Sequence, residues 1–306
     1  GVLAEVTLAD AIQKDVLTGH ADDIPAALLS SAESPGARPQ DGRRGIKDYL
    51  EYGYLPHDLH DESVSATLDY CIADKAIANA LGHLGIDNGR FQERARGFEL
   101  LLDSGSAVYR PRLSSGEFRE PFDKCEWGNG FCESNPWQAS WGALHDPDVL
   151  LRIHGSAAAV CEELDRFFTA RPYYFVGSYG KEIHEMAEMA SVEFGQWAIC
   201  NQPSFHIPYL YSYFGHPLRC AHWVHRAMRD LFSAEIDGFP GDEDNGSMSA
   251  WYIWGALGLY PLNPTIPRYT LSVPFFSAVT VHMDNGNDIR IERRLTSNVV
   301  TPGGSV

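Results

Sequence analysis

The sequence has no apolar run long enough to cross a membrane, since none approaches the roughly 18 to 20 residues that a spanning helix needs. Basic residues are also scarce: 24 Lys and Arg face 41 Asp and Glu, which gives a net charge of −17. Nucleic-acid binding requires clustered cations that contact phosphates, so this balance argues against a nucleic-acid partner. The six cysteines show no paired CxxC spacing, and a structural zinc site of that type is not expected.

The start of the chain and two of its cysteines bear on processing and compartment. The first residues lack an initiating Met and also lack the basic start and long apolar stretch of a signal peptide. We therefore expect a processed chain or a fragment. Cys125 and Cys132 flank a Gly-rich turn, and two states are open to them: a disulfide in an oxidising compartment, or free buried thiols.

The chain is rich in helical patterns and ends in a β pattern. Apolar residues recur near a 3.6-residue period over residues 64–84 and 154–170, which predicts helices there. From Arg268 onward apolar and polar residues alternate, with residues 285–286 (NG) as a hairpin signal. We predict a helical part over residues 1–267 and a C-terminal β segment with its tail over residues 268–306. The most linker-like segment is residues 38–45 (RPQDGRRG), and residues 301–305 are typical of a disordered tail.

Polar residues gather where four of the predicted helices begin. Two of these groups come directly before Pro136 and Pro203, and proline is a favoured first helical residue. If the inner helices of an all-α barrel begin at one rim, the four groups surround one pocket. The four groups are residues 61–63 (DES), 133–135 (ESN), 201–202 (NQ) and 242–246 (DEDNG).

The group at residues 242–246 contains three carboxylates. The N-terminal end of a helix favours the ionised form of a carboxyl group, which suits a catalytic base or a metal ligand for Asp242 and Asp244. Ordinary helix capping by Asp244 or Asn245 explains the group equally well. A calcium-binding EF-hand loop is excluded, because Ile253 stands where that motif requires Glu.

A helix is predicted over residues 181–199, with His184 and Glu188 beside its apolar stripe and Glu185 on the other side. A zinc protease motif is excluded, because Glu188 stands where the second His would be. The alternative is a solvated acidic helix face. The stripe is Ile183, Ala187, Ala190 and Phe194.

Glu133 lies close in sequence to Trp137 and Trp141. Apolar surroundings raise the pKa of a carboxyl group and keep it protonated, as a general acid requires. A capping Glu near a helix start is the plain alternative. No GxSxG nucleophile motif and no phosphate-binding Gly-rich loop occurs, and His145, His154 and His206 suit core or capping roles as well as catalytic ones.

Short strings between about residues 45 and 292 resemble glycoside hydrolase family 92, the calcium-dependent exo-acting α-mannosidases, and follow the family's order. The strings are 62–70 (ESVSATLDY), 110–112 (RPR), 121–123 (PFD), 133–138 (ESNPWQ), 183–186 (IHEM), 201–204 (NQPS), 209–211 (YLY), 241–246 (GDEDNG) and 258–261 (GLYP).

The resemblance implies a mainly α fold, an (α/α)6-barrel-type catalytic domain followed by short β-strands. It also implies release of a terminal, non-reducing α-linked mannose from glycans, N-glycans among them, with inversion. Glu133 then matches the family's general acid, and Asp242 with Asp244 match the carboxylates that activate water. Inverting hydrolysis in general needs one protonated and one ionised carboxyl group with a water between them.

The resemblance further implies a Ca²⁺ ion that contacts mannose hydroxyls, and substrate contacts from His184, Glu185 and Trp137. Hard oxygen donors near helix starts suit this ion. The candidate ligands are Glu185, Asn201, Gln202 and Asp244.

The chain departs from the family in two ways. Residues 133–141 read ESNPWQASW, whereas members more often have Gly and Ala at the second and fourth places. Family members are also longer and begin with a β-sandwich domain, so we expect this chain to need a second chain or fragment that carries it. The alternatives are a mannoside-binding, lectin-like module, an inactive or structural fragment, and another (α/α)6 enzyme such as a phosphorylase or an epimerase. A secreted or periplasmic location is expected for an acidic, Trp-rich, sugar-cleaving chain.

Overall fold

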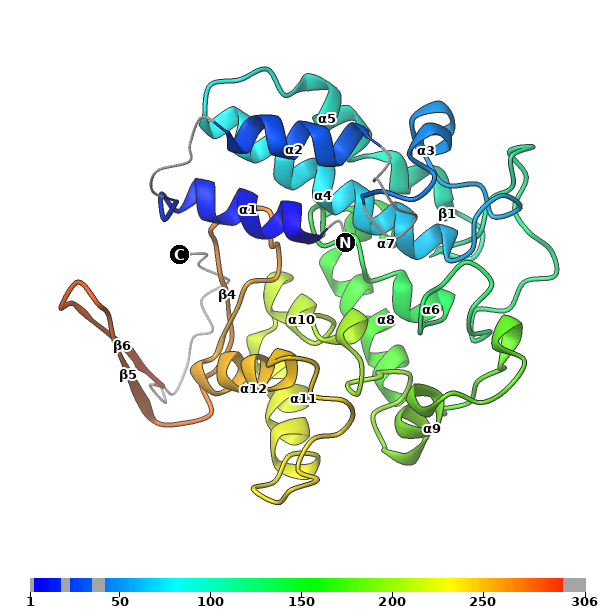
Figure 1. Ribbon diagram of the computed structural model, residues 1–306. Coiled ribbons are helices and arrows are strands. Elements are labelled where there is room, and N and C mark those ends of the chain that lie inside the picture. Colours follow the sequence, from blue (N-terminus) through cyan, green and yellow to red (C-terminus); the bar gives the residue numbers. More distant parts are fainter. Residues whose placement is uncertain (1–2, 18–22, 35–41, 294–306) are drawn as a thin grey trace. The chain divides into compact units, whose positions relative to one another are not determined.

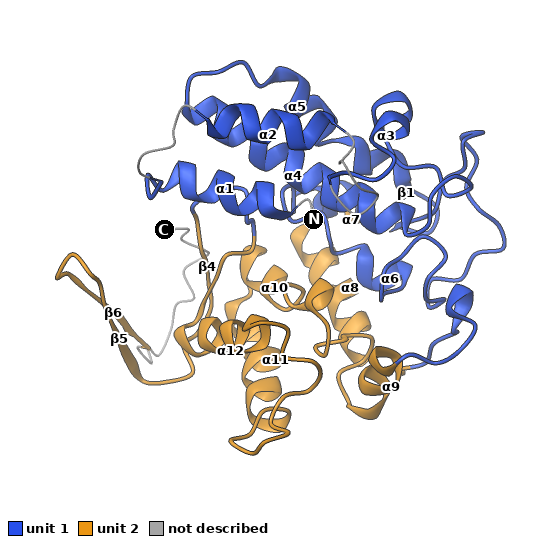
Figure 2. Ribbon diagram, viewed as in Figure 1, with its two compact units in different colours: residues 1–153, 173–183, 263–267 blue, residues 154–172, 184–262, 268–306 orange. Residues whose placement is uncertain are grey.

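The computed structural model describes residues 3–17, 23–34 and 42–293. Figure 1 shows that helices dominate the chain and that strands occur as short pairs. The chain forms two compact units, coloured separately in Figure 2: unit 1 comprises residues 1–153, 173–183 and 263–267, and unit 2 comprises residues 154–172, 184–262 and 268–306. None of the described helices is long and apolar enough to span a bilayer.

Unit 1 is built around α4 (Ser63–His83), on which α1 (Leu3–Gln13), α2 (Ile24–Glu33) and α5 (Gly89–Arg94) pack. Buried alanines on α4 let these helices approach closely, and Ile77 and Leu81 fill the space between them. The other elements of the unit are α3 (Ile46–Tyr52), η1 (Gly97–Leu101), β1 (Leu102–Asp103), β2 (Val108–Tyr109), α6 (Pro136–Ala139), α7 (Val149–His154) and η2 (Gly177–Tyr179).

A buried ion-pair network also holds unit 1 together. Arg43 donates to Asp74 over 2.7 Å and to Glu5 over 2.9 Å, and the three side chains are almost completely buried. The predicted linker over residues 38–45 is therefore wrong at Arg43, while residues 38–41 lie outside the described residues. Two buried carboxylates compensate the guanidinium charge of Arg43. Because both lie far from Arg43 in the sequence, the composition of residues 38–45 could not predict that Arg43 is buried.

Unit 2 has an aromatic core. Phe168 of α8 (Ala157–Thr169) stacks on Trp223 of α11 (Pro217–Asp230), with ring centres 4.6 Å apart, and contacts Trp197 edge-on. Much of the chain's aromatic content therefore serves packing. The other helices are α9 (His184–Ser191), η3 (Gln202–Ser204), α10 (Tyr209–Tyr213) and α12 (Ser247–Leu257).

The predicted β pattern is confirmed in unit 2. β5 (Ala278–His282) pairs antiparallel with β6 (Asp288–Glu292), and the turn between them contains Asn285 and Gly286, which has a φ of +81°. β3 (Leu259–Tyr260) pairs with β4 (Thr270–Leu271). The chain passes from unit 1 to unit 2 between residues 267 and 268. The division into parts 1–267 and 268–306 stays a prediction, and residues 301–305 lie outside the described residues.

The helix predicted over residues 181–199 is shorter than expected, because α9 ends at Ser191. Gly195 has a φ of +66°, and a Cβ there would lie 2.3 Å from the backbone oxygen of Phe167, so the chain must turn. The buried face of α9 consists of Glu185, Met186 and Met189. Within α9 the predicted apolar stripe is therefore wrong, because Ala187 is exposed and Ala190 is only partly buried, whereas Phe194, beyond the end of α9, is buried.

Cys125 and Cys132 are closer to the second of the two states left open above, although only Cys125 is buried. All six thiols are free, so Cys125 and Cys132 are not joined.

The helix predicted over residues 154–170 is confirmed in α8, whose first turn is capped by the Ser156 hydroxyl.

Candidate active site

In unit 2, two of the predicted helix starts come together. The Gln202 side-chain amide donates to the Asp244 carboxylate. Gly241 makes this approach possible, because a Cβ on Gly241 would lie 2.5 Å from the backbone oxygen of Cys200. The Asn201 side-chain oxygen accepts from the Gln202 N–H over 3.0 Å and so fixes the turn into η3. Segments separated by about forty residues in sequence thus meet at polar side chains.

A cluster of carboxylates surrounds His184 at the start of α9. Its Nε2 lies 3.2 Å from Glu185 Oε1 and 3.9 Å from Asp242 Oδ2, and its Nδ1 lies 3.2 Å from Glu188 Oε1. Burial opposes the charge on His184, but the Glu188 hydrogen bond and the neighbouring carboxylates outweigh it, and the pKa of His184 is raised. The Glu185 side chain is 9% exposed and that of Asp242 is 76% exposed. The cluster therefore runs from a buried carboxylate to one in solvent.

One carboxylate oxygen of unit 2 has the chemistry that a hard cation such as Ca²⁺ favours. Among the described residues, Glu185 Oε2 is buried without a hydrogen-bond partner, and such an atom favours a cation or a donor. Within the described ranges no three His, Cys, Asp or Glu side chains are arranged to hold a metal. A calcium site that includes the carboxylates of Glu185 and Asp244 would need further ligands, such as the amide oxygens of Asn201 and Gln202. Carboxylate and amide oxygens are the ligands that calcium prefers.

Unit 1 contains the Glu133 segment. Asn135 caps α6 by accepting from the Gln138 N–H over 2.9 Å, as the predicted helix start requires. Glu133 has a φ of +46°, and its N–H donates to the Tyr179 hydroxyl over 2.7 Å. Its side chain is exposed, so within unit 1 the carboxyl group borders solvent and is not enclosed by tryptophans.

Trp137 lies on α6, shortly after Glu133 in the sequence, and is buried, with 7% of its surface exposed. The Lys124 ammonium lies 3.3 Å from the centre of a Trp137 ring, in a cation–π contact. A sugar that stacks on this face would have to displace Lys124.

The start of α4 lies against the Glu133 segment. The Val64 and Ser65 N–H groups both donate to the Gly130 carbonyl, over 2.9 and 3.2 Å. The Cys132 N–H in turn donates to the Ser65 hydroxyl over 3.0 Å. The second pair of predicted helix starts is therefore joined in unit 1.

Acidic side chains gather around Cys132 in this pair. Burial raises the pKa of the Cys132 thiol to about 12, with further contributions from Glu62, Glu133 and Asp69. Burial alone raises the pKa of Asp69 to about 6. Burial therefore favours the uncharged forms of Cys132 and Asp69.

Each unit therefore joins two of the four predicted helix starts. Three neighbours of the predicted residues were not proposed as site residues from the sequence. Glu188 could have been predicted, since it lies four residues after His184 on a helix and such residues are neighbours on the helix surface. Asp69 could also have been noticed, since it is an acidic residue in a largely apolar helix. Tyr179 reaches Glu133 only through the tertiary fold. Unit 1 holds Glu133 and Trp137, and unit 2 holds His184, Glu185, Asn201, Gln202, Asp242 and Asp244.

Residues 1–301 match the glycosyl hydrolase family 92 catalytic domain. The chain belongs to this family. The family resemblance inferred from short strings is thereby confirmed, as is the mainly helical fold, because the structural matches are to family 92 catalytic domains of the (α/α)-barrel type.

Two solved structures of family 92 come from Bacteroides thetaiotaomicron. An inverting mannosidase is 32% identical with a TM-score of 0.83, and the match covers 97% of this chain and 40% of that one. An α-mannosidase, also solved in complex with mannoimidazole, is 30% identical with a TM-score of 0.79, and the match covers 94% of this chain and 36% of that one.

A protein of Arthroderma benhamiae described as an uncharacterized secreted glycosidase is 24% identical over 315 residues, which cover 92% of this chain and 38% of that protein. The family 92 chain described here thus spans about two fifths of the length of these relatives.

Proposed function

We propose that this chain forms the helical part of a glycosidase that releases terminal, non-reducing α-linked mannose from glycans, such as N-glycans, with inversion at the anomeric carbon. Family membership and the mannosidase names of two relatives support this proposal. The observation that carries it is the grouping in unit 2, where His184 contacts both Glu185 and Asp242. A carboxylate cluster with one buried and one exposed member suits binding of a polar substrate beside water.

Asp242 and Asp244 are the proposed activators of the attacking water. A base needs an ionised carboxylate that is open to water, and the Asp242 side chain is largely exposed. The Gln202 amide holds the Asp244 carboxylate by donating to it. The pair then accepts the proton of the water as the water attacks the anomeric carbon.

Glu133 is the proposed general acid, which donates a proton to the oxygen of the departing sugar. The Glu133 N–H donates to the Tyr179 hydroxyl, which holds the backbone from which the Glu133 side chain projects. Glu133 is also one of three acidic side chains, with Glu62 and Asp69, that act on the neighbouring Cys132 thiol. Inverting glycosidases in general separate acid and base by roughly 6.5–9.5 Å.

Glu185, Asn201, Gln202 and Asp244 are the proposed ligands of a Ca²⁺ ion. When bound, the ion would supply positive charge to the mannose hydroxyl groups. We propose that His184, Glu185 and Trp137 contact the sugar, with Lys124 moving off the Trp137 ring as it binds.

We further propose that a second chain or fragment with a β-sandwich domain completes the substrate pocket. The chain's two-fifths share of its relatives' length supports this. A secreted or periplasmic location is also proposed, with support from the description of the fungal relative.

The test is release of free mannose from α-1,2-mannobiose, measured with calcium and again with EDTA, with the anomer identified by NMR. Calcium-dependent release of β-mannose is the expected result. Binding without release would instead indicate a lectin-like module or an incomplete enzyme. Phosphate-dependent cleavage would indicate a phosphorylase, and an isomerised sugar would indicate an epimerase.

A further inference from the structure

The backbone of Glu133 has a conformation that its residue type does not favour. Its φ is +46°, in the left-handed region that residues with a Cβ rarely adopt. Such a conformation persists only where surrounding contacts hold it, and it sets the direction in which the side chain leaves the backbone. The contacts that hold Glu133 therefore decide where its carboxyl group lies.

Residues 173–179 run alongside the loop that leads to Glu133. The Phe175 N–H donates to the Cys125 carbonyl over 3.1 Å, and the Trp127 N–H donates to the Phe175 carbonyl over 2.9 Å. These two bonds form a parallel bridge between the two stretches of chain. The loop before Glu133 is thus tied to residues that follow it by about forty positions.

Two glycines let these stretches approach closely. A Cβ on Gly177, which has a φ of +53°, would overlap the Trp127 carbonyl oxygen. A Cβ on Gly128, which has a φ of +73°, would overlap the Ser178 hydroxyl and would lie 3.2 Å from the Tyr179 ring. The Tyr179 ring therefore lies directly against the backbone of the loop.

Tyr179 supplies the contact to Glu133 itself. Its hydroxyl accepts from the Glu133 N–H over 2.7 Å. On the other side of Glu133, the Ser134 carbonyl accepts from the Gly128 N–H over 3.2 Å. The chain is therefore held both before and after the Glu133 side chain, and a side-chain hydroxyl from η2 provides the first of these two contacts.

We propose that Tyr179 is a positioning residue for Glu133, whose hydroxyl holds the Glu133 backbone in the left-handed conformation that places the carboxyl group for proton donation. This inference rests on the proposed role of Glu133 as general acid. Tyr179 acts through Glu133 and not on the sugar. Its loss should therefore slow only those substrates that need a proton from Glu133.

The first test is Tyr179→Phe, which removes the hydroxyl oxygen and keeps the ring beside Gly128. With α-1,2-mannobiose, whose leaving oxygen needs a proton, kcat should fall roughly tenfold, the worth of one hydrogen bond. With 4-nitrophenyl α-mannoside, whose leaving group needs little protonation, kcat should stay within about twofold of the wild type. An equal fall on both substrates would indicate general damage to the fold and would overturn the proposal.

The double variant Glu133→Gln with Tyr179→Phe separates a positioning role from an independent one. If Tyr179 acts through Glu133, the double variant should turn over mannobiose as slowly as Glu133→Gln alone. Two losses that multiply would overturn the proposal, because they would show that Tyr179 acts without Glu133.

Backbone amide hydrogen exchange at Glu133, measured by ¹H–¹⁵N NMR on the full chain, tests the contact without any turnover. The Glu133 N–H should exchange roughly tenfold faster in Tyr179→Phe than in the wild type. Unchanged exchange would overturn the proposal. If the wild type releases no mannose from either substrate, the proposed hydrolysis fails for this chain, whereas exchange at Glu133 still decides whether Tyr179 holds this residue.

Ser178→Ala is a second variant that changes an exposed residue of the same segment. It removes the hydroxyl that accepts from the Asn129 N–H over 2.7 Å, and it should give a smaller loss of the same kind. Tyr174→Phe is the matched control, because the Tyr174 hydroxyl donates to Glu182 instead. It should leave both rates and the exchange at Glu133 unchanged.

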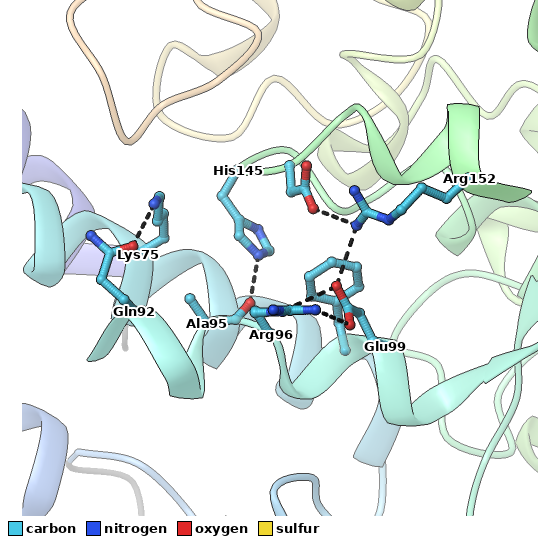
Figure 3. Close-up of a pocket in the computed structure, with 9 residues that line it drawn as sticks. Lys75, Gln92, Ala95, Arg96, Glu99, His145 and Arg152 are labelled. Atoms are coloured by element: carbon cyan, nitrogen blue, oxygen red, sulfur yellow. Dashed lines mark hydrogen bonds and ion pairs between the residues drawn. The ribbon is translucent and has the colours of Figure 1, made fainter. Parts of the chain in front are cut away.

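Arg152→Ala controls for a general loss of stability in unit 1. Arg152 lines a cavity of about 420 Å³ (Figure 3) and donates to Asp146 over 2.7 Å and to Glu99 over 3.3 Å. Neither Glu133 nor Tyr179 is among the described residues that line this cavity. Arg152→Ala should not separate the two substrates. If it did, the dependence on the leaving group would report stability and not the position of Glu133, and the proposal would fail.

Discussion

The helix starts of unit 1 and those of unit 2 carry the same kind of residue in opposite surroundings. In unit 1, the acidic groups Glu62, Asp69 and Glu133 all act on one partly buried thiol, that of Cys132. Around Asp242 and Asp244, the neighbours include a histidine and an amide donor. Like charges favour a protonated carboxyl group, whereas donors and cations favour an ionised one.

The difference shows that a carboxylate at a helix start has no fixed chemistry. Local sequence provides a side-chain cap at α6 in unit 1 and at η3 in unit 2, whereas α12 begins after Gly246 without one. The tertiary neighbours then decide which side chains the carboxyl group meets and how much water reaches it. An inverting glycosidase needs one carboxyl group that gives a proton and one that takes a proton. Substitutions in each unit test whether Glu133 has the first role and Asp242 with Asp244 the second.

The largest effect is expected from Asp244→Asn in unit 2. The substitution removes the negative charge and keeps the size of the side chain, so the proposed water activation should be lost and the proposed calcium site should lose a charged ligand. We expect kcat to fall by roughly 10²–10⁴-fold with 4-nitrophenyl α-mannoside and with α-1,2-mannobiose alike, the usual range for general acid–base groups.

Asp230→Asn is the control for this prediction, because Asp230 is an exposed acid of unit 2 that pairs with Arg226 on α11. It should keep the wild-type rate. A normal rate in Asp244→Asn would end the role of Asp244 as base or ligand.

Glu133→Gln in unit 1 should separate the two substrates. Mannobiose needs a proton on its leaving oxygen, so its turnover should fall by about 10²–10⁴-fold, whereas the activated aryl mannoside should lose far less. Glu117→Gln, an exposed glutamate of the same unit, serves as the control. Equal losses on both substrates would remove Glu133 from the acid role and with it the contrast between the units.

The sequence predicted the local features of both regions well. Asn135 caps α6 and Asn201 caps η3 where polar residues precede proline, because capping depends on neighbours in the chain. The hairpin around residues 285–286 followed from its turn residues for the same reason.

Features that depend on distant partners were missed or misjudged. Arg43 reads as part of a linker, yet Glu5 and Asp74 bury it. α9 ends early because Gly195 meets the backbone of α8, which no periodicity reveals. The contact of Tyr179 with Glu133 likewise arises only when the chain folds back on itself.

Asp69 offers a test of the acidic surroundings in unit 1 through stability. Its pKa is raised from 3.8 to about 6 in the folded chain by burial. Between pH 4 and 6 the folded state therefore keeps a proton that the unfolded state releases, so the free energy of unfolding falls as the pH rises, by up to about 3 kcal/mol. Asp69→Asn should remove this contribution, as measured by denaturant unfolding at several pH values.

The comparison between wild type and variant isolates Asp69 from other groups that titrate in this range, such as His145. Asp10→Asn is the matched control, since Asp10 is a helical aspartate of unit 1 that pairs with Lys14 near the surface. It should keep the wild-type pH dependence. The same pH dependence in Asp69→Asn would show that burial does not hold the Asp69 carboxyl group in its protonated form.

The smallest effect is expected from Glu188→Gln in unit 2. Glu188 holds Nδ1 of His184 at 3.2 Å, and this hydrogen bond leaves Nε2 directed at Glu185 and Asp242. An amide keeps a weaker acceptor, so kcat/KM should fall by only about 2–10-fold, the worth of one hydrogen bond. Glu193→Gln, an exposed glutamate just after α9, should change nothing. A fall in kcat/KM as large as the fall expected for Asp244→Asn would mean that Glu188 takes part in the reaction itself. Unit 2 would then contribute a further reacting group beside Asp242 and Asp244.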